Sequence, residues 1–165
     1  LRVALHGHIY LTDSEQGFLS TIGILHNIGF SVLHHNYPDQ FSTLFLHNPP
    51  SSMDVFLDNE RVIFDGLDHC LAGKYLLDKW YFPSFIGDTL ARYLSHDIDL
   101  DDHMVVLLRL SNYLALQTSF FIYPDNPPDF WISALPEFWD MSVILNVLPE
   151  LAQDVAMHQG VLEQN

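Results

Sequence analysis

Apolar residues along this chain recur mainly at helical spacing, and the alternation of apolar and polar residues that marks strands is rare. Three apolar residues share one face of the first predicted helix: Phe18, Ile22 and Leu25. Asp13 or Ser14 can cap the start of this helix, and Gly29 is suited to its end. The pattern predicts an all-α fold, a helical bundle of about seven to nine helices.

Prolines and glycines divide the rest of the chain into further predicted helices. A short helix is expected around Val32 and Leu33, and longer ones at 39–46, 53–64, 83–96, 104–116, 136–148 and 149–162. A further helix, after Asp68, is expected to carry Leu71, Tyr75, Leu76 and Lys79. Asp68 is placed to cap this helix. The segment 123–129 has the composition of a linker, so we expect a helical core at 1–122 and a helical extension at 123–165 packed on that core.

The charge of the chain narrows the classes of partner that it can bind. The chain has 6 Lys and Arg residues and 21 Asp and Glu residues, which give a formal net charge of −15. Such a surface repels phosphate backbones and anionic headgroups, so we expect binding to neither nucleic acid nor membrane. No apolar run approaches the about 20 residues that span a bilayer. A single cysteine, Cys70, suits a reducing compartment and predicts a cytoplasmic protein.

Three segments carry short motifs in a characteristic order. The first ends in Leu25-His26-Asn27-Ile28-Gly29; the second has His69, then Gly73, Leu76-Leu77 and Trp80; the third is Leu110-Ser111-Asn112. Together they resemble the HDOD (HD-related output domain) family of the HD superfamily, in its C-terminal, HD-like half. The resemblance implies an HD-superfamily-like helical bundle, and the further helical half of an HDOD domain is expected either to be missing or to lie before residue 1.

The same resemblance implies a site whose metal ligands have been replaced. The family helix ends in a His-Asp pair that binds a divalent metal, whereas Asn27 follows His26 in this chain. An amide oxygen is neutral and ligates a metal far less strongly than a carboxylate does. Asn112 stands at a second expected Asp, and Ser95 at an expected His. The degenerate site that follows consists of His26, Asn27, His69, Ser95, His96 and Asn112.

Two interpretations of this site remain open at this point. Three imidazoles could still hold a divalent metal weakly: His26, His69 and His96. Otherwise the residues form a polar cluster kept for packing, with no cofactor and no catalytic residue. We favour a non-catalytic module of bacterial signal transduction, whose partners are signalling proteins, attached signalling domains or further copies of the chain. The alternative is a metal-dependent phosphohydrolase, or a cyclic-dinucleotide phosphodiesterase, with a degenerate site.

Two other features have a structural interpretation beside a functional one. We expect Cys70 to be a small buried residue and not a nucleophile, because adjacent helical side chains diverge and His69 could then not act as its base. The aromatic residues Trp131, Phe138 and Trp139 either pin the C-terminal extension to the core or form a surface for a partner.

Overall fold

The computed structural model describes residues 11–46, 53–95, 99, 101–116 and the single positions 146, 149 and 153. Every regular element in these residues is helical, so the predicted all-α class is confirmed. The helices are α1 (Asp13–Leu25), α2 (Ile28–Asn36), α3 (Pro38–Leu46), α4 (Met53–Ile63), α5 (His69–Lys79), α6 (Ser84–Arg92) and α7 (His103–Leu116). No helix within these ranges combines the length and the apolar character needed to cross a membrane.

A capping box starts α1. The Thr12 hydroxyl accepts a hydrogen bond from the Glu15 backbone N–H, and the Glu15 carboxylate accepts one from the Thr12 N–H at 2.7 Å. The prediction of Asp13 or Ser14 as the cap is wrong, because Thr12 is the residue with a Glu three positions on. Asp68 caps α5 as predicted, since its carboxylate accepts from the Leu71 N–H at 2.8 Å.

A break in the helix separates α1 from α2. Because α1 ends at Leu25 and α2 begins at Ile28, the prediction that the first helix ends at Gly29 is wrong. Gly29 lies inside α2, where an added Cβ would stand 1.7 Å from the backbone oxygen of His69. Only a glycine therefore lets α2 pack so closely on α5. Gly73 allows the close contact between α5 and α6, because a Cβ added there would stand 2.8 Å from a methyl group of Leu90 on α6.

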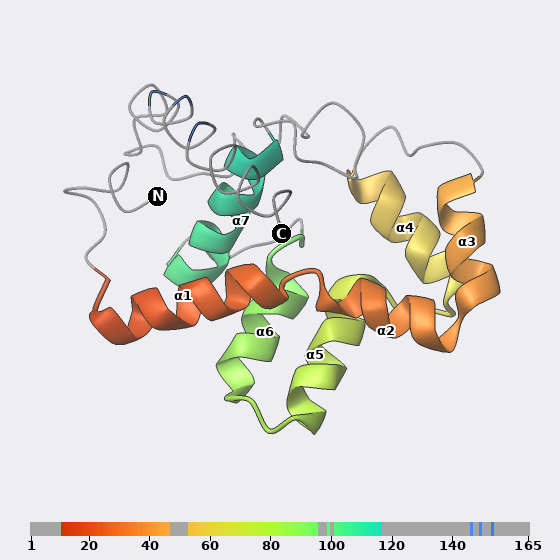
Figure 1. The fold of residues 1–165 in the computed structure, drawn as a ribbon, viewed down its shortest axis with the longest axis horizontal. Helices are drawn as coiled ribbons and strands as arrows, with labels where there is room; N and C mark the ends of the chain where they lie inside the picture. The colour runs from red at the N-terminus through yellow and green to blue at the C-terminus, as the bar shows by residue number, and fades with distance from the viewer. Residues whose placement is uncertain are drawn as a thin grey trace, which may run out of the picture.

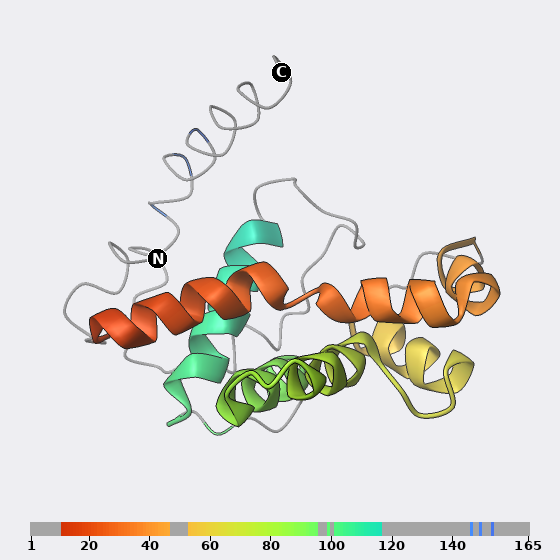
Figure 2. The same ribbon diagram turned by 60° about the horizontal axis from the view of Figure 1, so that its bottom comes forward.

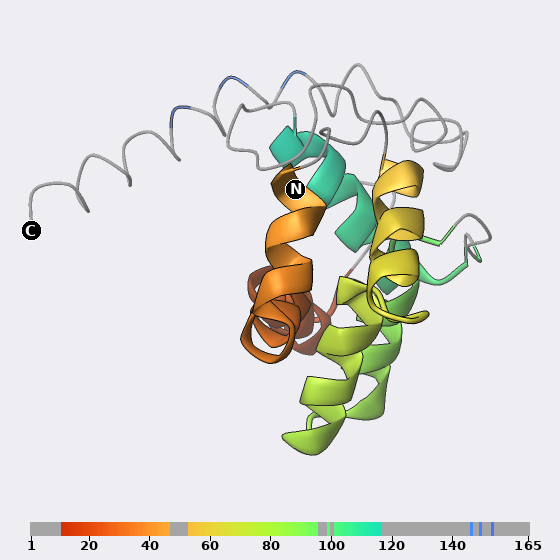
Figure 3. The ribbon, with the colours of Figure 1, turned by 90° about the vertical axis from the view of Figure 1, so that its right-hand side faces the viewer.

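The helices are arranged around α5. Figures 1 and 2 show α1 and α2 running end to end along one line, with the hairpin of α5 and α6 beside them. α5 contacts α2 on one side and α6 on the other, while α7 packs on α1 and α6. Figure 3 shows α3 and α4 standing next to each other, on the side of the molecule reached by α2.

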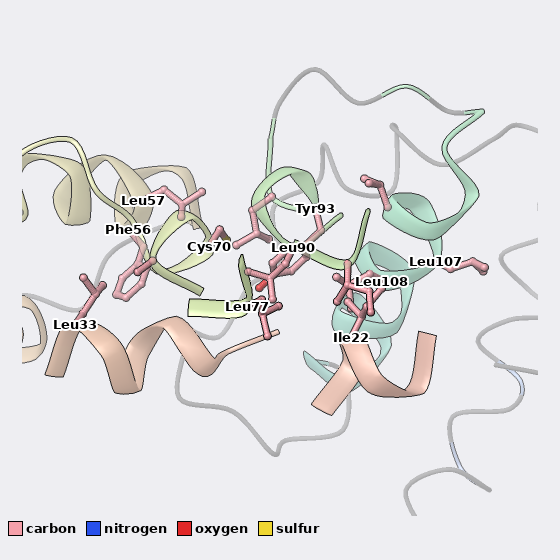
Figure 4. Close-up of a cluster of buried hydrophobic side chains, with 14 of the residues drawn as sticks. Ile22, Leu33, Phe56, Leu57, Cys70, Leu77, Leu90, Tyr93, Leu107 and Leu108 are labelled. Atoms are coloured by element: carbon pink, nitrogen blue, oxygen red, sulfur yellow. The ribbon is translucent and has the colours of Figure 1, made fainter. Parts of the chain in front are cut away.

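One apolar core runs through this arrangement. Figure 4 shows it extending from the α2–α4 end, through α5 and α6, to the α1–α7 end; its labelled members include Leu33, Phe56, Cys70, Leu77, Leu90, Ile22 and Leu108. Each of these side chains is at most 2% exposed. Several polar side chains are buried together with this core: Glu60, His69, Arg109 and Asn112.

Candidate functional site

His26 lies at the junction of α1 and α2, as the C-cap residue of α1. Its ring Nδ1 is 2.6 Å from the carbonyl oxygen of Gly23, so Nδ1–H donates and the neutral tautomer is protonated there. The ring also meets that of Tyr93 edge to face, with 6.0 Å between centroids. Burial lowers the pKa of His26, the Gly23 bond opposes this, and the charge of His69 lowers it further. His26 is thus neutral at neutral pH, with a lone pair on Nε2.

The two expected carboxylate positions hold amides, of which one is half-buried and the other buried. Asn27 is the N-cap residue of α2, yet its side chain makes no capping hydrogen bond. Its Oδ1 is buried and has no hydrogen-bond partner among the residues that the structure describes. Asn112 is buried on α7, with 6% of its surface exposed. Neither side chain brings the negative charge that would hold a divalent cation.

His69, in the first turn of α5, is enclosed by partners. Its Nδ1 is 2.7 Å from Oε2 of Glu60 on α4, and that oxygen also accepts from the His69 backbone N–H at 3.2 Å. Phe30 of α2 stacks on the imidazole, with 4.1 Å between centroids. Nε2 lies 3.5 Å from Sγ of Cys70. The prediction that the His69 and Cys70 side chains diverge is therefore wrong, since Nε2 and the neighbouring sulfur are in contact.

The charge states of this cluster follow from its burial. Glu60 and His69 are 0% exposed. Burial alone lowers the pKa of His69, but the contacts with Cys70 and Glu60 outweigh it and raise that pKa to about 10. Burial raises the pKa of the Cys70 thiol, against the effect of His69. The Glu60 carboxylate at Nδ1 favours the protonated imidazole, and the raised pKa of Cys70 favours the thiol, so Cys70 is not an activated nucleophile.

A buried guanidinium ties the end of α6 to α7. Arg109 Nε donates to the carbonyl oxygen of Tyr93 at 2.8 Å, and Nη2 donates to that of Ser95. α6 ends at Arg92, so the prediction that this helix ends near residue 96 is wrong. The Arg109 bonds satisfy carbonyl groups of the non-helical residues that follow it. Burial lowers the pKa of Arg109 to about 10, against the nearby charge of Asp54, and the group stays charged at neutral pH.

The predicted site is only partly assembled. His26 and His69 lie within electrostatic reach of each other, and the Tyr93 ring contacts His26 while its carbonyl binds the buried guanidinium. Ser95 contributes a backbone oxygen, and His96 lies outside the described residues. Within the described ranges, no group of three or more His, Cys, Asp or Glu side chains is placed to hold a metal ion. Both ring nitrogens of His69 are engaged by Glu60 and Cys70 and the two amides carry no charge, which does not match the donor set of a divalent-metal site.

Two residues central to this site were not singled out from the sequence. Arg109 had a signal, since it is the lone charge in an apolar run, and a buried charge must find partners. Glu60 had none: Asn59-Glu60-Arg61 has the composition of an exposed helix face, and no motif connects Glu60 with a histidine nine positions away.

Comparison with known proteins gives one match. No curated protein and no solved structure matches the chain. The family model described as "HDOD domain" matches residues 4–97, which include the two glycines of the α2–α5–α6 packing and the histidines at positions 26 and 69. The chain therefore belongs to the HDOD family, a branch related to the HD superfamily.

Proposed function

We propose that this HDOD domain is a non-catalytic regulatory module of bacterial signal transduction. It would act through contacts with partner proteins or with attached signalling domains, in the cytoplasm. The observation that carries the proposal is the pair of contacts of the buried His69 ring, with Nδ1 at Oε2 of Glu60 and Nε2 at Sγ of Cys70. A metal ligand must offer a lone pair, and an imidazole protonated on both nitrogens offers none.

The distribution of positive charge supports the same proposal. A phosphohydrolase neutralises phosphate with metal ions or with cations that converge on one site. In the described part of the chain, three of the basic side chains are engaged by carboxylates: Arg61 by Asp58 and Asp68, Lys74 by Asp78 and Asp88, Arg92 by Asp102. Arg109 donates to backbone carbonyls in the interior. These cations serve the fold and are spread over separate helices.

The test measures metal content and phosphoester hydrolysis of the full chain after incubation with Mn²⁺, Fe²⁺ or Zn²⁺. Bis-p-nitrophenyl phosphate and a cyclic dinucleotide serve as substrates. We expect no turnover from the wild type. We also expect none from the double variant Asn27→Asp, Asn112→Asp, because restoring two carboxylates leaves His69 protonated and buried.

His26→Ala and His35→Ala form the matched pair of controls, since His35 is an exposed histidine of α2. Stoichiometric metal and turnover that disappear in His26→Ala, but persist in His35→Ala, would establish the phosphohydrolase alternative. In the host, the proposal expects that a folded His26→Ala variant keeps its signalling output, because no reaction depends on that imidazole.

A further inference from the structure

The connection between α5 and α6 exposes an unusual group of large side chains. Tyr75 is 56% exposed, Trp80 53% and Tyr81 93%. Figures 1 and 3 show this connection at the free end of the α5–α6 hairpin, which projects away from α3, α4 and α7. We call Tyr75, Lys79, Trp80 and Tyr81 the hairpin tip. Single exposed apolar residues are ordinary, but adjacent exposed aromatics at a projecting point mark contact surfaces.

The backbone conformation at Tyr81 makes a non-glycine residue unfavourable at this exposed position. Tyr81 has φ 58°, in the left-handed region where a side chain is strained and glycine is preferred. It follows the C-cap residue Trp80 in a Schellman motif, in which Phe82 N–H donates to the Leu77 carbonyl at 3.0 Å. Tyr81 N–H donates to the Asp78 carbonyl at 3.1 Å. Folding alone would favour glycine at this position, so the exposed tyrosine points to a function outside folding.

The charge around the tip differs from that of the whole molecule. The α5–α6 stretch from 69 to 92 carries three basic residues and two acidic ones, a net charge of +1 in a chain of −15. Lys74 binds both acids, Asp88 at 2.6 Å and Asp78 at 3.4 Å. Lys79 is exposed, and it has no ion-pair partner among the described residues.

We propose that the hairpin tip is the surface through which two copies of this chain associate. Two molecules of charge −15 repel each other over most of their surfaces, and they approach most easily where the local charge is close to zero. A basic partner would instead be drawn to the acidic remainder of the chain. In a two-fold arrangement, Lys79 of each copy meets the half-exposed carboxylates of Asp78 and Asp88 on the other. Tyr81 and Trp80 then bury their rings at the centre, as aromatic anchors of interfaces do.

This inference does not rest on the proposed function, because an active phosphohydrolase could associate through the same surface. The test is sedimentation equilibrium of the full chain over a range of concentrations. We expect a monomer–dimer equilibrium that shifts to dimer as salt is added, because salt screens the repulsion between the two acidic molecules.

Tyr81→Gly separates loss of the interface from loss of the fold. Glycine suits the left-handed backbone, so the variant keeps or raises the melting temperature of the monomer. We expect its dimer dissociation constant to rise about 30-fold or more, the effect of removing an aromatic anchor. Val62→Ala is the matched control, since Val62 is an 83% exposed apolar residue on α4, and this change should leave association unaltered.

Lys79→Glu tests the electrostatic part of the argument. It changes the local charge of the 69–92 stretch from +1 to −1, so we expect weaker association, most clearly at low salt. Three results would each overturn the proposal: a wild type that stays monomeric at all concentrations and salt levels, a Tyr81→Gly variant that associates as the wild type does, or a Val62→Ala variant that loses association equally.

Discussion

Replacing Gly29 with alanine should separate two helices that the fold needs in contact. A Cβ at position 29 would lie 1.7 Å from the backbone oxygen of His69, 2.6 Å from its carbonyl carbon and 2.8 Å from the Gly73 backbone nitrogen. All three atoms belong to the backbone of α5, so no side chain can rotate to make room. The clash can be relieved only if α2 and α5 move apart as helices.

The size of this movement sets the energy. A carbon and a carbonyl oxygen in contact lie about 3.3–3.6 Å apart, so the helices must separate locally by about 1.7 Å. That separation breaks the stacking of Phe30 on His69, which has 4.1 Å between centroids, and loosens the apolar contacts on both sides. Overpacking against an immobile backbone together with these losses gives a cost of about 3–5 kcal/mol, a large part of the about 5–15 kcal/mol that holds a domain of this size.

The assay is urea unfolding followed by the helical circular dichroism signal, with Gly23→Ala as the matched control. Gly23 lies inside α1 and has nothing within 4 Å of an added Cβ. Alanine there should raise the free energy of unfolding by about 1 kcal/mol, from helix propensity alone. If Gly29→Ala falls within about 1 kcal/mol of the wild type, the close approach of α2 to α5 is refuted.

The other predictions concern the buried polar groups and the first cap. His69 has a folded-state pKa of about 10 against an ordinary 6.5, so the contribution of its protonated ring to the free energy of unfolding is complete below pH 6.5 and declines as the pH rises towards 10. The urea midpoint should therefore fall between pH 6.5 and 9, and a flat profile would contradict this. Glu60→Gln removes the carboxylate from a buried charged pair, so it should cost about 3–5 kcal/mol and flatten that pH profile. Thr12→Ala loses the capping box and should cost about 1 kcal/mol, whereas Thr21→Ala, inside the same helix, should not destabilise, as thermal melts of both variants can check.

The sequence predicted where helices occur better than it predicted where they end. Periodicity and proline positions located α3, α4 and α7 to within one residue at each end, and Asp68 marked the start of α5, because those signals are local. The ends of α1 and α6 are set by tertiary contacts instead. Gly29 suggested a helix end, but its role is to admit α5. α6 ends at Arg92, and a guanidinium from α7, distant in sequence, binds the carbonyl groups of Tyr93 and Ser95 that follow it.

The sequence motifs identified His26 and His69 as candidate site residues, whereas Glu60 and Arg109 were identified only from the structure. His26 and His69 were placed by the spacing of short motifs, and both lie in the region where α1, α2 and α5 meet. The contact of Cys70 with His69 was predicted wrongly, because a general rule about adjacent helical side chains ignored the particular rotamer that brings Nε2 within 3.5 Å of the sulfur. Whether His96 contributes stays a prediction, since it lies outside the described residues.

The histidine that the family resemblance would assign to a metal can perform only one of two tasks. As a ligand, His69 would need a neutral ring, an open path for the ion and anionic neighbours around that ion. As a core residue it has the reverse: a positive charge, 0% exposure and a carboxylate partner at 2.7 Å. Neutral amides at positions 27 and 112 agree with the second task, because neither supplies the negative charge that a bound divalent cation would need. The buried contacts between Glu60 and His69 thus hold α4 to α5, and they leave neither nitrogen of this imidazole facing an open site.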